Sequence, residues 1–490
     1  MKYKLIGLSA VTLMLIAIIF ISKSLPEDNG KRYHQHIEAE EKKSYTHTDA
    51  RLCTHLPIIK IDTNGQAIPG EPILDAPGGH TLRYTMSETG EETILSKLSV
   101  IDNSGENNHT EDAFSVSSDI RIRIRGNSSR HFEKKGYIIK LITADGLNNP
   151  QSMMGMDSHH EWALHGPYLD KTLLRNYICY NLAGEIMGYS PNVRFCELVL
   201  NGEYRGLYLM TETITAGKEG ARLSLSVNKK DNSFSGYLLR LDRGSNTELK
   251  NINNFSKYTY KSESVLNIVY PGNDNLTYEL ANGISDDFSE FEKALYSYDY
   301  DSGEFGYEKY IDVDSFVDYF LINEFTSNYD AGSKSTYIYK GVDGKFHMCV
   351  WDFNNAFDNY QENETSYRVF ALQDSLWYDM LFKDEKFVER VIERYYELEE
   401  KYLNDEYMNS YIDSVIEYLG PAIDRNFEIW GHTFRPEWDR LFDFYRNLHS
   451  YDEAIDQLKG YIKDRSDWMK ENIESLRQYS AESKVKNYNY

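Results

Sequence analysis

The chain of 490 residues lacks several features that would assign it quickly to a class of protein. It has four cysteines and no CxxC spacing, so neither a zinc site nor a thioredoxin-type redox site is predicted. No GxxxxGK[ST] loop occurs, which excludes a P-loop nucleotide site. Basic residues (53) are outnumbered by acidic ones (77), and no long basic stretch is present, so nucleic acid is not an expected partner. The net charge of −24 indicates a well-solvated surface.

The positions of the cysteines favour free thiols over disulfides. Cys179, Cys196 and Cys349 each lie within an apolar run, which predicts that they are buried. Four cysteines in an exported protein could also pair, with Cys53 among them, and the sequence does not give their connectivity. We therefore predict buried free thiols, with disulfides as the alternative.

The N-terminus carries the clearest local signal. Lys2 and Lys4 precede an apolar run, Leu5–Ile21, which is followed by Lys23. The run is short for a membrane span and would also suit a signal peptide, but no small-x-small cleavage site comes after it. We predict an uncleaved signal anchor over residues 1–25, with its N-terminal end cytoplasmic and the ectodomain outside. The expected location is a single-pass cell-membrane protein, or a secreted protein if the segment is cleaved.

The rest of the chain divides by composition into a β-rich part and a helical part. Residues 26–52 are charged and polar and are predicted to be a linker. Residues 53–285 contain short strand-like segments, whereas residues 286–480 have the periodicity of helices, and a tail, 481–490, follows. The sequence therefore predicts an α+β fold, with a β-rich N-terminal lobe and a helical C-terminal lobe after the anchor.

Several local signals predict individual elements of this fold. Asn201-Gly202 is a strong hairpin turn. Asp170 predicts the start of one helix, and Asp312 or Asp314 the start of another. The segment Arg121-Ile-Arg-Ile-Arg125 alternates strictly, as expected for a strand with one dry face. Strands are predicted over segments rich in β-branched or alternating residues, namely 56–61, 95–102, 120–125, 137–143, 195–200, 206–210, 236–241 and 265–270.

Two carboxylates flank a predicted hairpin in the second half of the chain. Asp330 follows a predicted helix. A hairpin is predicted next, with strands over 336–340 and 345–350, and Asp352 comes directly after it. This order of helix, carboxylate, hairpin and carboxylate is the one in which a protein-kinase-like site is assembled. In that chemistry the first carboxylate lies beside the acceptor hydroxyl, and the second holds Mg²⁺ on the nucleotide phosphates.

The segments around these carboxylates resemble the spore-coat CotH family of atypical, kinase-like phosphotransferases. The similarity extends over nearly the whole predicted ectodomain, from about Leu56 to Trp430. Several segments match in the right order, which makes the resemblance specific: Leu56-Pro-Ile-Ile59, Arg125-Gly-Asn-Ser-Ser129, Lys134-Lys-Gly-Tyr-Ile-Ile-Lys140, Glu161-Trp-Ala-Leu-His-Gly-Pro167, Asn201-Gly-Glu-Tyr-Arg-Gly206 and Trp351-Asp-Phe353.

The resemblance implies an atypical kinase fold that uses ATP and a divalent metal, Mg²⁺ or Mn²⁺. Carried over by position, Asp330 would be the catalytic acidic residue and Asp352 the metal ligand. Lys140 would be the strand lysine that pairs with the nucleotide phosphates. Arg125, and Ser128 in the turn that follows it, would also contact phosphate.

The sequence departs from the family pattern at the metal ligands. Asn354 stands where many members have a second aspartate, and its carbonyl oxygen can bind a hard cation without adding charge. Ser335 stands where ordinary kinases have the asparagine that holds a second Mg²⁺, and it is a weaker ligand. Arg240 ends a strand that the family usually ends with glutamate. The predicted metal site of Asp352, Asn354 and Ser335 is therefore weaker than the family pattern implies.

The supporting residues of the site are less well determined. The acidic partner expected for Lys140 stays open among Asp170, Glu185 and Glu212. The pair Arg175-Asn176, on the helix predicted after Asp170, either links the lobes structurally or supports the site.

We expect a kinase that transfers phosphate from ATP to Ser or Thr hydroxyls of extracytoplasmic or coat proteins. A related transfer, attaching an amino acid or a nucleotide to a protein side chain, would suit the same fold. The alternative from another class is a catalytically inactive surface adhesin or assembly factor that keeps the fold for binding. A carbohydrate hydrolase would use paired carboxylates, but no glycosidase motif is present. The expected partners are an extracytoplasmic protein substrate and, through the N-terminal segment, the membrane.

Overall fold

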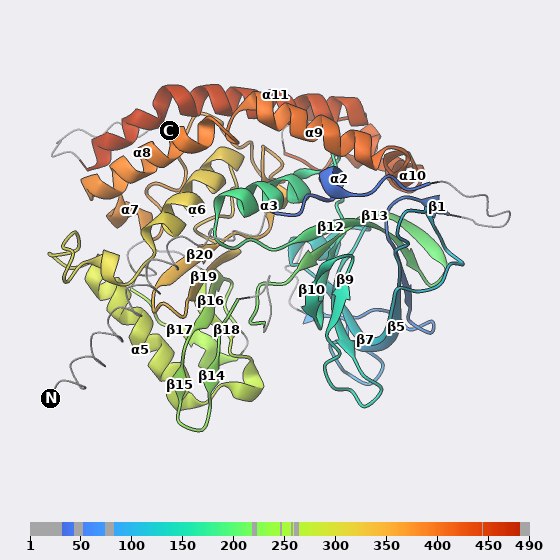
Figure 1. Cartoon of the computed structure of the whole chain (residues 1–490), viewed down its shortest axis with the longest axis horizontal. Helices are drawn as coiled ribbons and strands as arrows, with labels where there is room; N and C mark the ends of the chain where they lie inside the picture. Colours follow the sequence, from blue (N-terminus) through green and yellow to red (C-terminus); the bar gives the residue numbers. More distant parts are fainter. Residues whose placement is uncertain are drawn as a thin grey trace, which may run out of the picture. The chain divides into compact units, whose positions relative to one another are not determined.

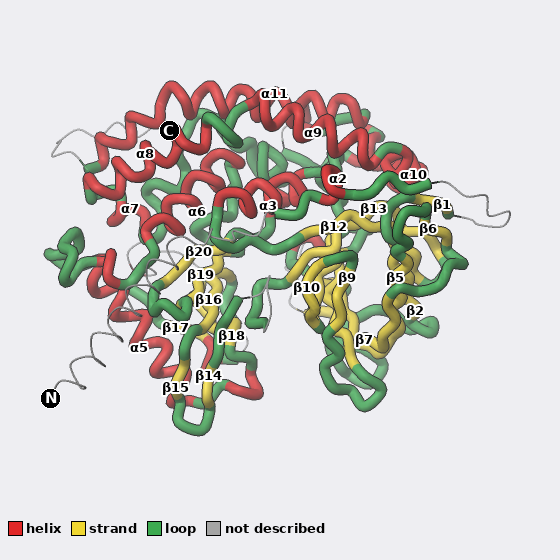
Figure 2. The backbone as a smooth tube through the Cα atoms, viewed as in Figure 1, coloured by secondary structure: helices red, strands yellow, loops and turns green. Residues whose placement is uncertain are grey.

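In the computed structural model the chain divides into two compact units, Met1–Tyr33 and His34–Tyr490. The second unit has a mixed α+β architecture with a β-rich first half and a helical second half, as predicted (Figure 1, Figure 2). The structure describes residues 32–43, 52–73, 83–217, 223–245, 247–255, 258, 264–442 and 444–480.

A closed barrel forms most of the first half, with the strand order β11-β13-β12-β2-β5-β7-β8. The predicted alternation is confirmed, because the isoleucines of Arg121-Ile-Arg-Ile-Arg125 are buried in the barrel core and the arginines lie on the other face. The bounds of the barrel strands are Ile58–Asp62 (β2), Ile94–Ile101 (β5), Val116–Arg125 (β7), Gly136–Ile142 (β8), Glu161–His165 (β11), Val193–Leu200 (β12) and Glu203–Glu212 (β13).

The hairpin between β12 and β13 turns at the predicted Asn201-Gly202. Both residues have positive φ, 52° and 79°, as a two-residue type I′ turn requires. Leu200 pairs with Glu203 across the turn. The turn signal in the sequence is therefore confirmed, and it sets the register of two long barrel strands.

A second, five-stranded sheet has the order β17-β18-β16-β19-β20. β16 pairs with β18 on one side and with β19 on the other, so the sheet draws strands from both sides of residue 285, the predicted lobe boundary. β19 and β20 form the hairpin predicted between the two carboxylates. The bounds are Tyr237–Asp242 (β16), Asn251–Ile252 (β17), Val265–Tyr270 (β18), Thr336–Lys340 (β19) and Phe346–Cys349 (β20).

Two helices, α5 (Tyr278–Leu295) and α6 (Val313–Thr326), pack against this second sheet. The rings of Phe288 and Phe291 lie 5.4 and 5.5 Å from that of Phe346 on β20. Further helices are α2 (Gln35–Glu38), α3 (Arg175–Ile186), α7 (Tyr378–Leu381), α8 (Glu385–Glu399), α9 (Asp405–Leu419), α10 (Pro421–Trp430) and α11 (Tyr451–Asn472). Short two-stranded sheets pair β1 (Cys53–Thr54) with β6 (Asn108–His109), β3 (Pro72–Ile73) with β4 (Arg83–Tyr84), β9 (Gln151–Met153) with β10 (Met156–His159), and β14 (Val227–Asn228) with β15 (Ser233–Phe234).

Two predicted helix starts have different outcomes. The carboxylate of Asp312 accepts from Ser315 N and caps α6, which confirms one of the two predicted caps. The helix predicted to begin at Asp170 begins at Arg175 instead. The Asp170 carboxylate accepts from the backbone N–H of Thr172 (3.1 Å) and of Arg175 (2.9 Å), and this holds the residues between them in a turn.

Part of the predicted linker, residues 26–52, belongs to the second unit and packs on its barrel. Gln35 in α2 is buried. Its Nε2 donates to Phe195 O (3.1 Å), and its Oε1 accepts from Phe195 N (2.7 Å), so one side chain satisfies both backbone groups of a barrel residue.

The prediction of a single-pass membrane location is corrected by the structure. Within the described ranges, no helix combines the length and the apolar character that crossing a bilayer requires. The segment predicted as the anchor, residues 1–25, lies outside those ranges.

The prediction of free thiols is confirmed. All four cysteines are unpaired; Cys179, Cys196 and Cys349 are buried, and Cys53 is exposed. Burial raises the pKa of the Cys196 thiol, so this group stays protonated and inert.

Candidate active site

A cleft of about 800 Å³ is lined by residues of the barrel and of the five-stranded sheet. Figure 1 shows these two sheets standing side by side beneath α3 and α6. Strands β7, β8 and β11 contribute on one side, and β16, β18 and β19 on the other. The predicted site residues that line the cleft are Arg125, Ser128, Asp330, Ser335, Asp352 and Asn354.

Asp352 follows β20 in a strained backbone conformation. Its φ is 62°, a left-handed value that is uncommon for a residue with a side chain. Its backbone N–H donates to the hydroxyl of Tyr180 on α3 (3.0 Å), and Asn354 Nδ2 donates to its Oδ1 (2.5 Å). Strain of this kind persists only where the surroundings fix it, and it is common at functional sites.

Asp330 lies on the loop after α6, whose C-cap, Ser327, is also left-handed (φ 47°). Asn355 Nδ2 donates to Asp330 Oδ2 (2.8 Å), and Lys334 Nζ lies 4.0 Å from Oδ1. The side chain is 18% exposed, so a molecule in the cleft can reach it.

The two carboxylates share surroundings that favour their protonated forms. Burial raises the pKa of Asp352, and the nearby charges of Asp330 and Asp242 raise it further, against the opposing charge of Arg125. Burial also raises the pKa of Asp330, against the opposing charge of Lys334. A bound cation relieves the repulsion between two such carboxylates, so it stabilises their charged forms more than it stabilises that of an isolated carboxylate.

Asn176, near the start of α3, is connected to the loop that carries Asp352. Its Oδ1 accepts from Phe353 N (3.1 Å), and its Nδ2 donates to Asn354 Oδ1 (2.7 Å) and to His165 Nε2 (3.2 Å). Burial lowers the pKa of His165 to about 3, so the ring is neutral at physiological pH and can accept this bond. Asn176 therefore supports the site, which is one of the two alternatives that the sequence left open.

Arginines enter the cleft from both sides. The guanidinium of Arg125 on β7 lies 5.4 Å from the ring centroid of Trp351. From the opposite sheet, Arg240 Nε lies 3.9 Å from Asp242 Oδ2, and Arg243 NH1 lies 3.2 Å from Asp242 Oδ1. Because guanidinium groups match the geometry of phosphate oxygens, this concentration of arginines suits a polyphosphate ligand.

Four arginines that line the cleft were not predicted as site residues: Arg123, Arg130, Arg240 and Arg243. Arg123 lies two residues before Arg125 on β7, so the strict alternation already placed both on one face. Arg240 was noted only as a departure from a family glutamate, and no sequence signal marked Arg243.

Lys140 does not belong to the described residues that line the cleft. It lies on β8, two residues beyond the cleft residue Ile138, and pairs in register with Glu161. The structure therefore does not bring Lys140 together with the other predicted site residues. The acids considered as its partner are engaged elsewhere, in the contacts Asp170–Arg175, Glu185–His34 and Glu212–Asn192.

The oxygen donors in the cleft suit a hard divalent cation. Asp330 and Asp352 supply carboxylates, and Ser335, Asn354 and Asn355 supply neutral oxygens. Among the residues that the structure describes, no cluster of three or more His, Cys, Asp or Glu side chains could hold a metal by itself. Mg²⁺ is commonly held by one or two carboxylates together with substrate phosphates. The residues present fit this mode, in which the substrate completes the coordination.

The cleft also has an apolar region. Ile214, Val269, Tyr337 and Trp351 belong to one hydrophobic cluster and line the cleft. The rings of Tyr337 and Trp351 lie 5.9 Å apart, edge to face. A slot lined by aliphatic and aromatic side chains, with polar groups nearby, is typical of small-molecule and cofactor sites.

Comparison with known proteins confirms the resemblance read from the sequence. The family model described as CotH kinase protein matches residues 122–469, well over half of the chain. Inner spore coat protein H of Bacillus subtilis (strain 168) is 24% identical over 369 residues, which cover 73% of this chain and 88% of that protein. The described residues that line the cleft all fall within the matched range.

Proposed function

Because the chain belongs to the CotH kinase family, we propose that it transfers the γ-phosphoryl group of ATP to Ser or Thr hydroxyls of spore-coat proteins. The observation that carries this proposal is the meeting of Asp330 and Asp352 in one arginine-rich cleft. Phosphoryl transfer depends mainly on positioning and on electrostatic stabilisation, which such a set of groups supplies. The class of substrate is inferred from the name of the relative.

The proposal includes a kinase-like arrangement of two lobes. The barrel, with Arg125 and the turn that contains Ser128, would cover the nucleotide phosphates. The second sheet and its helices would form the other lobe, and both carboxylates lie on loops of that part. This division is supported by the position of the cleft, whose lining comes from both parts.

Within this arrangement the nucleotide base would occupy the apolar region near Ile214 and Val269. The phosphates would then lie against Arg125 and Arg240. We assign them to these arginines rather than to Lys140, because both arginines line the cleft. The polar and apolar parts of one cleft thus match the two ends of a nucleotide.

The carboxylates have separate parts in the proposed reaction. Asp330 would orient the acceptor hydroxyl and accept its proton, and its contacts with Asn355 and Lys334 would hold it in position. Asp352 and Asn354 would hold Mg²⁺ or Mn²⁺, which when bound neutralises phosphate charge.

ATP should stabilise the wild-type protein only when Mg²⁺ or Mn²⁺ is also present, because the carboxylates and arginines bind the two together. At about a hundred times the dissociation constant the stabilisation should reach about 2.7 kcal/mol, which a thermal shift detects. Transfer to a recombinant coat protein is then followed by intact mass. A folded sample that shows no shift with any nucleotide–metal pair would sink the kinase proposal.

Binding of Mg²⁺–ATP should weaken as the pH falls. The loss should begin at a higher pH than it would if the metal ligand were a carboxylate of ordinary pKa. The pKa of Asp352 is raised by burial and by the nearby charge of Asp242, and cation binding needs the charged form of this ligand. Binding is therefore complete above the raised pKa of Asp352 and is lost as the pH falls through it. Asp242→Asn removes a charge that raises this pKa, so it should move the loss of binding to lower pH in calorimetric titrations. Because the nucleotide's own protonation is common to both proteins, an unchanged midpoint would contradict this explanation.

A second candidate function is an assembly factor that uses the fold only for binding. The observation that favours it is the orientation of Asn354, whose amide nitrogen faces Asp352 and whose oxygen accepts from Asn176. Such a protein would bind its coat partner without a nucleotide. Normal coat assembly in cells that carry Asp330→Asn would favour this function over the kinase.

A further inference from the structure

The loop after Asp352 has a backbone that residues with side chains adopt only under constraint. Phe357 and Asp358 both have left-handed φ values, 51° and 60°. Such conformations persist only where surrounding contacts fix them. Two buried arginines, Arg175 and Arg446, supply several of these contacts.

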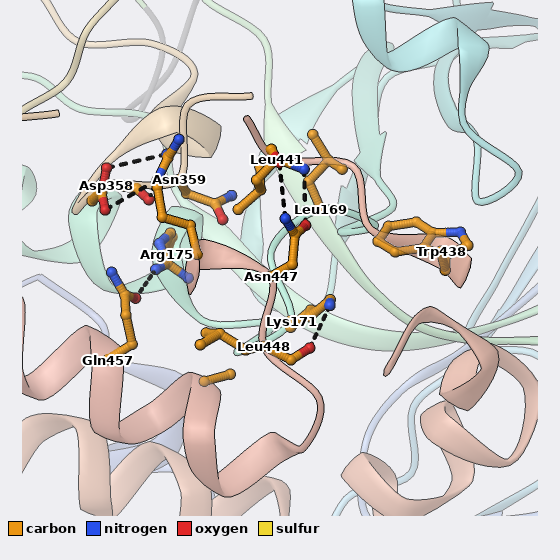
Figure 3. Close-up of a pocket in the computed structure, with 12 residues that line it drawn as sticks. Leu169, Lys171, Arg175, Asp358, Asn359, Trp438, Leu441, Asn447, Leu448 and Gln457 are labelled. Atoms are coloured by element: carbon orange, nitrogen blue, oxygen red, sulfur yellow. Dashed lines mark hydrogen bonds and ion pairs between the residues drawn. The ribbon is translucent and has the colours of Figure 1, made fainter. Parts of the chain in front are cut away.

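Arg175 holds the loop from the side of α3. Its Nε donates to Ala356 O (2.9 Å) and its NH2 to Phe357 O (3.3 Å). NH1 pairs with Asp170 (2.6 Å), and the two side chains are only 3% and 4% exposed, so their charges balance inside the protein. NH2 also donates to Gln457 on α11 (2.8 Å), a contact that Figure 3 shows.

Arg446 holds the next residues of the same loop, Asp358 and Tyr360. Its Nε donates to Asp358 Oδ2 (3.2 Å), and its NH2 donates to Asp358 O (3.1 Å) and Tyr360 O (2.6 Å). The side chain is 2% exposed. One guanidinium therefore binds both the side chain and the backbone of the strained segment. We call Arg175, Asp358 and Arg446 the arginine clamp.

Little free space remains beside the arginine clamp. The cavity in Figure 3, lined by all three of its residues, measures about 20 Å³. That is room for about one water molecule. The loop therefore has no larger space in this direction into which it could move while keeping these contacts.

The clamped loop carries the groups that orient both carboxylates. Asn355 donates to Asp330 (2.8 Å), and Asn354 donates to Asp352 (2.5 Å). Asn359 Nδ2 donates to Asn354 O (2.8 Å) and ties the two ends of the loop together. A displacement of the loop would move the donors of both carboxylates at once.

In protein kinases the loop after the metal-binding carboxylate is often ordered only by phosphorylation, through new pairs between arginine and phosphate. In this chain the loop after Asp352 instead carries an intrinsic carboxylate, Asp358, which pairs with Arg446 (3.1 Å). We propose that Arg446 is a positioning residue that keeps the site assembled without phosphorylation of this loop and without a partner protein. The inference rests on the proposed kinase function and concerns its regulation.

Arg446→Ala should act on the metal site and on turnover rather than on nucleotide affinity. We expect kcat to fall by about 10²-fold, as for a misplacement of about 1 Å at a reacting centre. The Mg²⁺ concentration for half-maximal transfer should rise about tenfold, as on loss of a group that orients a metal ligand. KM for ATP at saturating Mg²⁺ should stay within about threefold, because the arginines and apolar residues that contact the nucleotide are unchanged.

Two variants serve as controls for Arg446→Ala. Arg446→Lys keeps the charge but not the planar fork of donors, so it should recover only part of the lost activity. Arg440→Ala removes an exposed arginine from the same segment and should behave as the wild type.

Hydrogen exchange gives a readout that needs no activity. Amides of residues 353–361 should exchange faster in Arg446→Ala, whereas those of β19 should not change. Asp358→Asn keeps the shape of the side chain and removes its charge, so it takes the place of Arg446→Ala if that variant does not fold. Unchanged exchange and unchanged Mg²⁺ dependence in a folded variant would overturn the inference. Failure of the wild type to bind nucleotide would instead overturn the proposed function.

Phosphatase treatment tests independence from modification directly. Treated wild-type protein should keep its full rate of transfer, and peptides from residues 353–369 should carry no phosphate by mass spectrometry. A loss of transfer on treatment, restored by phosphorylation of this loop, would show that the arginine clamp does not suffice.

Discussion

Asp330→Asn should reduce phosphoryl transfer by about 10²–10⁴-fold while the protein still binds ATP with Mg²⁺. The carboxylate can accept the proton of the acceptor hydroxyl, and the amide cannot. The new side chain still offers an oxygen to Asn355, which donates to Asp330 in the wild type, so the geometry of the loop should survive. Transfer to a recombinant coat protein, followed by mass spectrometry, measures the first effect, and a thermal shift with Mg²⁺–ATP measures the second.

The same variant should make the ligand-free protein more stable at neutral pH. The pKa of Asp330 is raised by burial, so the folded state disfavours its charged form. A raised carboxyl pKa contributes stability at low pH, and that contribution is lost as the pH rises through the folded-state value. The neutral amide avoids the free-energy cost of burying the charged carboxylate at neutral pH. In acid, where the carboxyl group is protonated in any case, it adds no stability. Gains in stability with losses of activity are typical of functional sites.

Asp343→Asn is the matched control for Asp330→Asn, because Asp343 lies in the exposed turn of the hairpin between the two carboxylates. It should change neither transfer nor the stabilisation by Mg²⁺–ATP. A folded Asp330→Asn protein that transfers phosphate at the wild-type rate would remove Asp330 from the mechanism.

Asp352→Asn should remove most of the stabilisation by ATP and Mg²⁺. Loss of the charged ligand should weaken metal-dependent binding by about 100-fold. At a ligand concentration that stabilises the wild type by about 2.7 kcal/mol, the variant would then gain only about 0.4 kcal/mol. A thermal shift equal to that of the wild type would contradict the role of Asp352 as metal ligand.

Asn354→Asp provides the opposite change at the same site. It adds the second carboxylate that many family members have, in place of an amide that donates to Asp352 in the wild type. The variant should need less Mg²⁺ for half-maximal stabilisation by ATP at neutral pH, and it should be less stable without ligand because two neighbouring, partly buried carboxylates then repel each other. If its Mg²⁺ requirement is unchanged, Asn354 does not take part in cation binding.

Short-range signals in the sequence predicted the elements that carry the site. The turn at Asn201-Gly202, the cap at Asp312 and the alternation of residues 121–125 each depend on a few adjacent residues, and each is confirmed. The predicted hairpin between Asp330 and Asp352 also forms. Both carboxylates reach the cleft because one hairpin separates them in the sequence and returns the chain to the same place.

Contacts between distant segments could not be predicted in this way. Alternation gives the face of a strand on which a residue lies, but its depth in a cleft depends on strand register and on closure of the barrel. Lys140 and Ile138 occupy the same face of β8, and of the two only Ile138 lines the cleft. Arg446 meets Asp358 across 88 residues, and nothing near either residue in the sequence indicates the other.

Asp358 and Arg446 are made at different times. A ribosome that adds about 5–20 residues per second produces Asp330, Asp352 and the loop several seconds before it produces Arg446. During that interval the nascent chain has both carboxylates but lacks Arg446, the arginine that holds the loop after Asp352. Under the proposed function, a chain halted in translation before residue 446 would therefore carry both carboxylates without the complete arginine clamp, and its transfer should be at least about 10²-fold slower than that of the full chain.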